Sequence, residues 1–223
     1  MNFARRTIDV VLAGAALVLL LPVLLSIAAW LAIDGAGPVL YAETRLGRGA
    51  RPFRVHKFRT LRAGSAVAPE VAVPSDVRIT RPGRWLRRWR LDELPQLGDV
   101  LRGAMSLVGP RPQTEGNLSA LDAPVRERLL SVRPGLTSRA SLAHLGEDDV
   151  LAEVADPVHC YRTVLVPAKA RLELEDLERR SLARDLLVLL QTIAQVPSPR
   201  ARARSRQRVR ALLGSCAVKP GQA

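Results

Sequence analysis

The sequence contains few of the residues that usually bind metals or form covalent cross-links. Only two cysteines occur among 223 residues, Cys160 and Cys216, and they form neither a CxxC pair nor a zinc-ligand spacing. This pattern predicts neither a disulfide framework nor a metal site. The three histidines, His56, His144 and His159, share no ligand spacing either. We therefore interpret them as packing or surface residues.

Acidic residues are also scarce relative to basic ones. The chain has 34 Lys and Arg against 21 Asp and Glu, a formal net charge of +13. This excess predicts an anionic partner: nucleic acid, phospholipid headgroups or a phosphorylated substrate. Aromatic residues make up only 4% of the chain, and no recognised nucleic-acid-binding module accompanies the arginines, so nucleic acid is disfavoured. At this length we expect one catalytic-sized domain with accessory segments.

Charge is missing from one long stretch near the N-terminus. Residues 10–33 carry no charged side chain over 24 positions, enough for a helix to cross a bilayer core of about 30 Å. A secretory signal is the alternative. However, the run exceeds the usual apolar region of roughly 7–15 residues, and no cleavage site of the A-x-A type follows it. We therefore expect this segment to contact a membrane.

Pro22 lies at the middle of this apolar segment and should bend the helix, because proline removes a backbone hydrogen bond. Arg5 and Arg6 precede the segment, and a cluster of basic residues follows it at positions 45–59. Positive residues favour the cytoplasmic side of a membrane. A re-entrant helix, broken at Pro22 and returning to the side it entered, satisfies both flanks. A kinked spanning helix is the alternative, because prolines also occur in spanning helices.

The following residues favour a β-hairpin and then a loop. Two runs with β-branched and aromatic residues, 37–47 and 51–62, flank a turn that contains Gly47 and Gly49. Such runs around glycines are typical of a hairpin. Residues 62–74 are small, contain prolines and lack a periodic pattern. They predict a loop.

Residues 80–91 favour an amphipathic helix. Thr80 can cap it, Trp85, Leu86 and Trp89 share one side, and arginines fill the other. Tryptophan favours the boundary between water and lipid, and basic residues favour anionic headgroups. The helix therefore suits a membrane surface. A soluble amphipathic helix with a solvated basic face is the alternative.

Two adjacent carboxylates, Asp92 and Glu93, follow this arginine-rich segment. In one interpretation Asp92 caps a helix that Gly103 ends, and Glu93 complements the helix dipole. Capping needs only one acid, however, and adjacent carboxylates repel each other, so the pair requires a nearby cation. A helix start among arginines also binds phosphate readily. A carboxylate in that place can attack phosphorus or hold Mg²⁺.

Four motifs in a fixed order give the sequence its resemblance to a known family. The KFRT block lies in HKFRTLR (56–62), the DELPQL and GPRP blocks lie in ITRPGRWLRRWRLDELPQLGDVLRGAMSLVGPRP (79–112), and the PGLT block lies in VRPGLTS (132–138). With the apolar N-terminal segment, they resemble the bacterial sugar transferases, the monotopic polyprenyl-phosphate phosphoglycosyl transferases. The resemblance covers roughly residues 8–196.

The resemblance implies an enzyme that moves a sugar-1-phosphate from a UDP-sugar to polyprenyl (undecaprenyl) phosphate and releases UMP. Such a reaction initiates a membrane-bound glycan, namely exopolysaccharide, capsule, O-antigen or a glycoprotein glycan. The implied location is the cytoplasmic face of the bacterial inner membrane, in a monotopic arrangement. The expected fold is α+β and mainly helical, with a re-entrant membrane helix and a small catalytic domain containing a β-hairpin and amphipathic interfacial helices.

The resemblance also assigns roles to particular residues. Asp92 would be the nucleophile that carries a phosphosugar intermediate and a ligand of the Mg²⁺ cofactor, with Glu93 as its catalytic partner. The residues expected to bind substrate phosphates are Arg87, Arg111, Lys57 and Arg59. Pro22 corresponds to the proline that breaks the family's re-entrant helix.

This chain departs from the family pattern at some positions. Ala104 stands where the family usually has Asp, and Asp99 stands where it commonly has Asn. The Asp92–Glu93 pair is retained, and compensation by Asp99 is a hypothesis. We expect a re-entrant membrane helix in 1–36, a catalytic domain in 37–198 and a basic flexible tail in 199–223. An inactive membrane scaffold that binds anionic lipid is the alternative function. No motif selects a particular sugar or oligomeric state.

Overall fold

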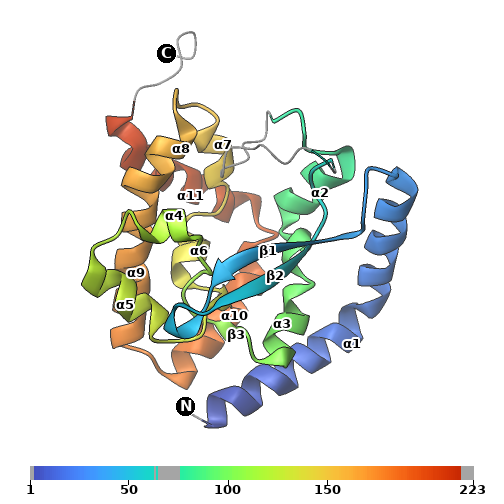
Figure 1. Cartoon of the computed structure of the whole chain (residues 1–223), viewed down its shortest axis with the longest axis horizontal. Coiled ribbons are helices and arrows are strands. Elements are labelled where there is room, and N and C mark those ends of the chain that lie inside the picture. The colour runs from blue at the N-terminus through green and yellow to red at the C-terminus, as the bar shows by residue number, and fades with distance from the viewer. Residues whose placement is uncertain (1–2, 63, 65–75, 217–223) are drawn as a thin grey trace.

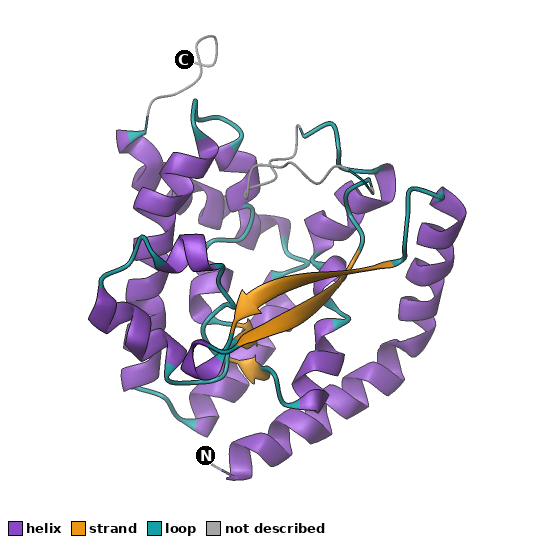
Figure 2. Cartoon of the chain, in the orientation of Figure 1, coloured by secondary structure: helices purple, strands orange, loops and turns teal. Residues whose placement is uncertain are grey.

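The computed structural model describes residues 3–62, 64 and 76–216. The chain is mainly helical, with two small sheets between the helices (Figures 1 and 2). The first elements are α1 (Phe3–Asp34), β1 (Leu40–Leu46), β2 (Pro52–Phe58), α2 (Arg81–Trp89), α3 (Gln96–Arg102), β3 (Ser106–Val108), α4 (Glu115–Leu118), α5 (Ala123–Leu130) and β4 (Gly135–Thr137). The remaining helices are α6 (Arg139–Ala143), α7 (Glu147–Leu151), α8 (Pro157–Cys160), α9 (Val166–Glu178), α10 (Leu182–Gln195) and α11 (Pro199–Leu212).

The predicted β-hairpin is confirmed. β1 and β2 pair antiparallel, with Leu40 opposite Phe58 and Leu46 opposite Pro52. The connecting turn needs a positive φ, which Gly49 adopts at 70°. Asp99 of α3 accepts hydrogen bonds from the backbone N–H of His56 in β2 (2.9 Å) and pairs with its ring (2.7 Å). Asp99 therefore attaches the hairpin to α3, so its role here is structural.

The GPRP and PGLT blocks meet where β3 and β4 run parallel. The N–H of Gly135 donates to Pro110 O (2.8 Å), and the N–H of Gly109 donates to Thr137 O (3.1 Å). A side-chain carbon added at Gly135 would lie 2.1 Å from the Gly109 nitrogen. The two glycines thus allow the two backbones to approach closely, and this junction places Arg111.

Helix α1 is the one helix in the described residues that is long and apolar enough to cross a membrane, with a mean hydropathy of 2.8 in its most apolar window. It is one continuous helix that contains Pro22 and changes direction along its length (Figure 1). Ser26 Oγ donates to the Pro22 carbonyl oxygen (2.8 Å). The helix that was expected to break at Pro22 is therefore continuous through this residue.

Both halves of α1 pack against the rest of the chain. Near its start, Arg6 donates to the carbonyl oxygens of Val100 (2.6 Å) and Leu101 (2.8 Å) in α3. Near its end, Ile27 and Leu31 are buried in a cluster that also contains Phe58 of β2 and Leu86 of α2.

Helix α2 lies within the segment 80–91 that was expected to be helical. The Thr80 side chain accepts a hydrogen bond from the Gly83 N–H (3.0 Å), which confirms the predicted cap. Leu86 is buried, whereas Trp85 is 46% exposed and makes an edge-to-face contact with Trp30 of α1, at 5.8 Å between ring centroids. This pair places two tryptophans where the apolar helix meets α2.

The C-terminal residues correct two expectations. The basic segment predicted to be flexible contains α11. Its Arg206 and Arg210 pair with Asp149 and Glu153, and its Val209 shares a core with Val150. Cys160 and Cys216 form a disulfide with a Cα–Cα distance of 6.3 Å, although the sequence predicted none. The two cysteines are 56 residues apart, so their pairing depends on how α11 packs. Their spacing in the sequence therefore did not predict the disulfide. Most of the predicted loop at 62–74 and the last residues of the predicted tail lie outside the described residues.

Candidate active site

The Asp92–Glu93 pair lies on a sharp turn between α2 and α3. Arg90 ends α2 in the left-handed region at φ 53°, an uncommon backbone conformation for a residue with a side chain. A single 3₁₀ turn, Leu91–Glu93, follows it. Helix α3 begins only at Gln96 after Pro95, and no side chain caps it. The interpretation of Asp92 as a helix cap is therefore wrong.

Glu93 is buried and faces three cations. Arg111 Nη2 lies 2.5 Å from Glu93 Oε1, and Lys57 Nζ lies 3.8 Å from the same oxygen. Arg90 Nη1 lies 3.6 Å from Oε2. Burial alone would raise the pKa of Glu93, but Arg111, Arg90 and Lys57 together hold it well below its usual range. Glu93 is therefore a fixed negative charge at the centre of a basic cluster.

Asp92 differs from its neighbour. It is only partly buried. Within the described part of the chain its carboxylate forms neither a hydrogen bond nor an ion pair. Burial and then the charge of Glu93 raise the pKa of Asp92, while Lys57 and Arg87 oppose the shift. The Glu93 carboxylate is thus bound by Arg111, Lys57 and Arg90, whereas the Asp92 carboxylate oxygens can contact a bound ligand.

Lys57 and Arg111 approach the pair from different motifs. Lys57 comes from β2, and burial lowers its pKa. Arg111 follows the junction of β3 and β4, and the charge of Glu93 raises its pKa. Its backbone N–H donates to Glu173 Oε1 (2.9 Å), and burial raises the pKa of Glu173 to about 7. The fold therefore brings the KFRT, DELPQL and GPRP blocks together at Glu93.

The other two expected phosphate-binding residues lie differently. Arg87 Nη2 pairs with Asp148 Oδ2 of α7 at 2.9 Å. Burial lowers the pKa of Arg87, but the negative charges of Asp148 and Asp92 raise it. Together these and smaller contributions outweigh burial, so the pKa of Arg87 is raised overall. The buried Arg59 guanidinium instead donates to the carbonyl oxygens of Leu31 (2.8 Å) and Pro38 (3.2 Å). The structure therefore places Arg59 at the end of α1 and does not bring it to Glu93.

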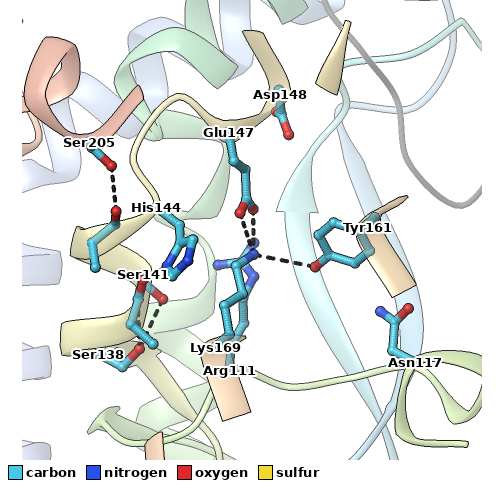
Figure 3. A network of polar contacts seen from close by, with 12 residues as sticks. Arg111, Asn117, Ser138, Ser141, His144, Glu147, Asp148, Tyr161, Lys169 and Ser205 are labelled. Atoms are coloured by element: carbon cyan, nitrogen blue, oxygen red, sulfur yellow. Dashed lines mark hydrogen bonds and ion pairs between the residues drawn. The ribbon is translucent and has the colours of Figure 1, made fainter. Parts of the chain in front are cut away.

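Several polar residues that the sequence patterns did not indicate lie near Arg111, among them Glu147 and Tyr161 (Figure 3). Lys169 is buried and its Nζ lies 2.5 and 2.6 Å from the two Glu147 carboxylate oxygens. The same Nζ lies 3.5 Å from the Tyr161 hydroxyl. Lys169 and Glu173 stand four residues apart in α9, so they share one helix face. Two charged residues at this spacing on a buried face were the signal that could have found them.

The three expected packing or surface histidines lie apart from one another. His144 is buried and its Nδ1 contacts the Ala140 carbonyl oxygen at 2.8 Å. His56 pairs with Asp99, and His159 is exposed. The part of the chain that the structure describes contains no cluster of three or more His, Cys, Asp or Glu suited to a metal ion. The burial of His144 and the exposure of His159 agree with their interpretation as packing or surface residues.

Comparison with known proteins gives the chain a clear set of relatives. The family model "Bacterial sugar transferase" matches residues 1–198. A UDP-glucose:undecaprenyl-phosphate glucose-1-phosphate transferase of Caulobacter vibrioides is 35% identical over 196 residues, covering 86% of this chain and 69% of the relative.

Two further relatives extend this pattern. A UDP-N-acetylgalactosamine-undecaprenyl-phosphate N-acetylgalactosaminephosphotransferase of Aeromonas hydrophila is 36% identical over 145 residues, covering 64% of this chain and 34% of the relative. The exopolysaccharide production protein PSS of Rhizobium leguminosarum bv. phaseoli is 39% identical over 148 residues, covering 63% of this chain and 74% of the relative. The chain thus matches about a third of the Aeromonas protein.

Proposed function

Because the chain belongs to the bacterial sugar transferase family, we propose that it transfers a sugar-1-phosphate from a UDP-sugar to undecaprenyl phosphate or a similar polyprenyl phosphate and releases UMP. The relatives named as UDP-sugar:undecaprenyl-phosphate transferases support this reaction. The observation that carries the proposal is the contrast between the two acids. Asp92 is partly buried and its carboxylate has no hydrogen bond or ion pair within the described residues, whereas Glu93 is buried among cations.

The proposed reaction has two displacements at one phosphorus. An Asp92 carboxylate oxygen attacks the phosphorus that bears the sugar, and the bond from this phosphorus to the oxygen of UMP breaks. A phosphate oxygen of the polyprenyl phosphate then attacks the same phosphorus. The bond to Asp92 breaks, and the carboxylate is restored. Two easier steps thus replace one difficult step, and a single site serves a soluble donor and a lipid acceptor in turn.

The surrounding cations suit this chemistry. Each displacement brings a negatively charged oxygen toward a negatively charged phosphoryl group, and fixed positive charges lower that repulsion. We propose Arg87, Lys57 and Arg111 as the groups that face the phosphates, with Glu93 holding Lys57 and Arg111 in place. Arg59 is left out of this set because its guanidinium is bound to the end of α1.

A magnesium ion fits this arrangement. Mg²⁺ prefers oxygen ligands and usually takes one or two carboxylates together with substrate phosphates and water. Asp92 offers carboxylate oxygens without an internal partner in the described residues, whereas those of Glu93 face Arg111, Lys57 and Arg90. We therefore propose Asp92 as the protein's magnesium ligand. When bound, the ion would neutralise charge on the diphosphate.

We also propose a monotopic arrangement at the cytoplasmic face of the bacterial inner membrane. Arg6 at the start of α1 binds carbonyl oxygens of α3, and Arg59 binds the Leu31 carbonyl oxygen near its end. Both ends of the helix are thus attached to one catalytic domain. This supports the view that α1 enters and leaves the bilayer on the same side, with Trp30 and Trp85 at the lipid boundary.

Cysteine labelling tests this topology. Single cysteines at Phe3 and Ile33, which are 81% and 85% exposed, should both react with a membrane-impermeant maleimide only from the cytoplasmic side. Inverted vesicles and intact cells supply the two directions of access. Labelling of the two positions from opposite sides would establish a spanning helix.

The Asp92→Asn variant tests the reaction. It should lose transfer by about three orders of magnitude or more, remain in the membrane fraction, and retain no phosphosugar from labelled UDP-sugar. Asp122→Asn is the matched control, because Asp122 is exposed and its side chain makes no capping bond. Full turnover by Asp92→Asn would exclude Asp92 as the nucleophile. Absence of UMP release from every UDP-sugar, together with binding to anionic lipid, would favour the inactive scaffold.

The product would begin a membrane-bound glycan. The Rhizobium relative named for exopolysaccharide production supports exopolysaccharide among the candidate products, which also include capsule, O-antigen and glycoprotein glycans. The relatives are named for both glucose and N-acetylgalactosamine. A screen of UDP-sugars with undecaprenyl phosphate, read by UMP release, identifies the sugar.

A further inference from the structure

Helix α7 presents three acidic residues in its first turn, and they point to different neighbours. Glu147 pairs with the buried Lys169 of α9 at 2.5 Å. Asp149 pairs with Arg206 of α11 at 3.4 Å. These two ion pairs attach α7 to α9 and α11. Two of the three acids therefore have a structural role.

The third acid reaches the candidate active site. Asp148 Oδ2 lies 2.9 Å from Arg87 Nη2, in the last turn of α2. Among the charges that raise the pKa of Arg87, Asp148 has the largest effect, ahead of Asp92. The Arg87 guanidinium therefore interacts with a carboxylate outside the Asp92–Glu93 pair, from a helix that the other two acids hold in position.

We propose that the Asp148 carboxylate occupies the position of a substrate phosphate oxygen on Arg87, and that the diphosphate of the nucleotide sugar displaces it on binding. This inference rests on the proposed function, which makes Arg87 a phosphate-binding residue. Carboxylate and phosphate oxygens accept the same hydrogen bonds from a guanidinium. Asp148 acts through Arg87, so it is a positioning residue.

The environment of the pair is suited to exchange. The Asp148 side chain is 42% exposed and that of Arg87 is 25% exposed, so water and an incoming anion can reach both. A partly exposed pair of this kind is held weakly compared with the buried Glu147–Lys169 pair. Asp148 keeps Arg87 oriented toward the site without substrate, and the substrate must compete with it.

Nucleotide affinity in Asp148 variants tests the inference. The full chain in detergent micelles is titrated with UDP at constant Mg²⁺. Because Asp148→Asn keeps the size of the side chain but removes the competing charge, it should bind UDP about three- to tenfold more tightly. Asp149→Asn is the matched control, since Asp149 lies on the same helix, carries the same charge and is 41% exposed. Its affinity should equal that of the wild type.

Two further variants separate displacement from a general change in structure. Asp148→Glu restores a carboxylate and should return the affinity toward the wild-type value. In an Arg87→Gln background, Asp148→Asn should leave UDP affinity unchanged, because the guanidinium for which the two anions compete is gone. Thermal unfolding of each variant shows that it is folded.

The possible outcomes decide the inference. Unchanged or weaker UDP binding by Asp148→Asn overturns it. Equal gains in Asp148→Asn and Asp149→Asn, or a gain that persists without Arg87, also overturn it, because either result indicates a long-range charge effect. Failure of the proposed function appears separately, as the absence of UMP release by the wild type, since UDP binding is measured without turnover.

Discussion

Replacing Arg111 with methionine would remove the closest cation from Glu93. Arg111 Nη2 lies 2.5 Å from Glu93 Oε1, and Nη1 lies 3.4 Å from Oε2, so the contact is two-pronged. Methionine keeps an unbranched apolar stem, so the main change is the loss of the charge and its hydrogen bonds. Glu93 would then be a buried carboxylate with only Arg90 and Lys57, at 3.6 and 3.8 Å, as cationic partners.

The size of the effect follows from burial. The Glu93 side chain is 10% exposed, and removal of one partner from a buried ion pair costs about 3–5 kcal/mol. Because two cations remain, we expect the lower end, about 3 kcal/mol. For a chain of this size, each kcal/mol lowers the melting temperature by about 2–4 °C, so the expected decrease is about 6–12 °C.

The same change should introduce a pH dependence. In the wild type, the lowered pKa of Glu93 provides stability that is present above the pKa of an unfolded glutamate, about 4.3, and is lost as pH falls toward the folded pKa. Arg111 is the cation that lowers the pKa of Glu93 most, so without it much of this stability is missing at neutral pH. The melting-temperature difference between wild type and variant should be widest at pH 7 and narrow below about pH 4.5.

Thermal unfolding by circular dichroism in detergent measures both effects. Arg139→Met is the control, because Arg139 pairs with Glu175 at 2.8 Å and both side chains are exposed. This variant should change stability by less than about 1 kcal/mol at either pH. A decrease below about 2 °C for Arg111→Met at pH 7, or a difference that does not change with pH, would refute the reasoning.

Two further predictions concern Glu173 and the junction of β3 and β4. Burial raises the pKa of Glu173 from 4.5 to about 7, so the wild type should lose about 1–3 kcal/mol as pH rises through this range. Glu173→Gln can still accept from the Arg111 N–H and should melt higher than wild type at pH 8 but equally at pH 4.5; parallel curves contradict this. Gly135→Ala would place a carbon 2.1 Å from Gly109 N and should cost about 3 kcal/mol or more. Gly14→Ala meets nothing within 4 Å and should gain about 0.5–1 kcal/mol; equal melting temperatures for the two alanine variants would exclude the close approach.

The features predicted correctly from the sequence are those set by local chemistry. The hairpin follows from the runs with β-branched residues on either side of Gly47 and Gly49. The helix cap follows from the Thr80 hydroxyl, which lies three residues before the Gly83 N–H and accepts its hydrogen bond. Gly103 ends α3 in the left-handed conformation, as expected. Each of these features involves residues close together in the sequence, so a short window contained the necessary information.

The features that sequence patterns missed depend on long-range packing. The Cys160–Cys216 disulfide and the Arg87–Asp148 pair join residues 56 and 61 positions apart. Arg59 lies two residues after Lys57, a spacing that would put both side chains on one face of a strand. However, β2 ends at Phe58, and the Arg59 guanidinium contacts the end of α1 instead. A shared motif therefore did not place the two cations in one site.

In the candidate site, the family motifs predicted Asp92 and Glu93 together with four cations, Arg87, Arg111, Lys57 and Arg59. The fold brings Lys57 and Arg111 to Glu93. The assigned catalytic roles stay predictions. The difference between the two acids was not visible in the sequence, because both are carboxylates in one turn. It arises from which side of that turn faces Arg111.

Helix α11 has a consequence for how this protein is cut or fused. The family model ends at residue 198, yet Val209 and Leu213 complete the apolar core around Val150, and Arg210 pairs with Glu153 at 2.6 Å. A chain that ended at residue 198 would lack α11 and therefore the apolar residues and ion pairs that pack against α7. The folded domain therefore extends beyond the region matched by the family model. A shortened version made for expression should keep all of α11.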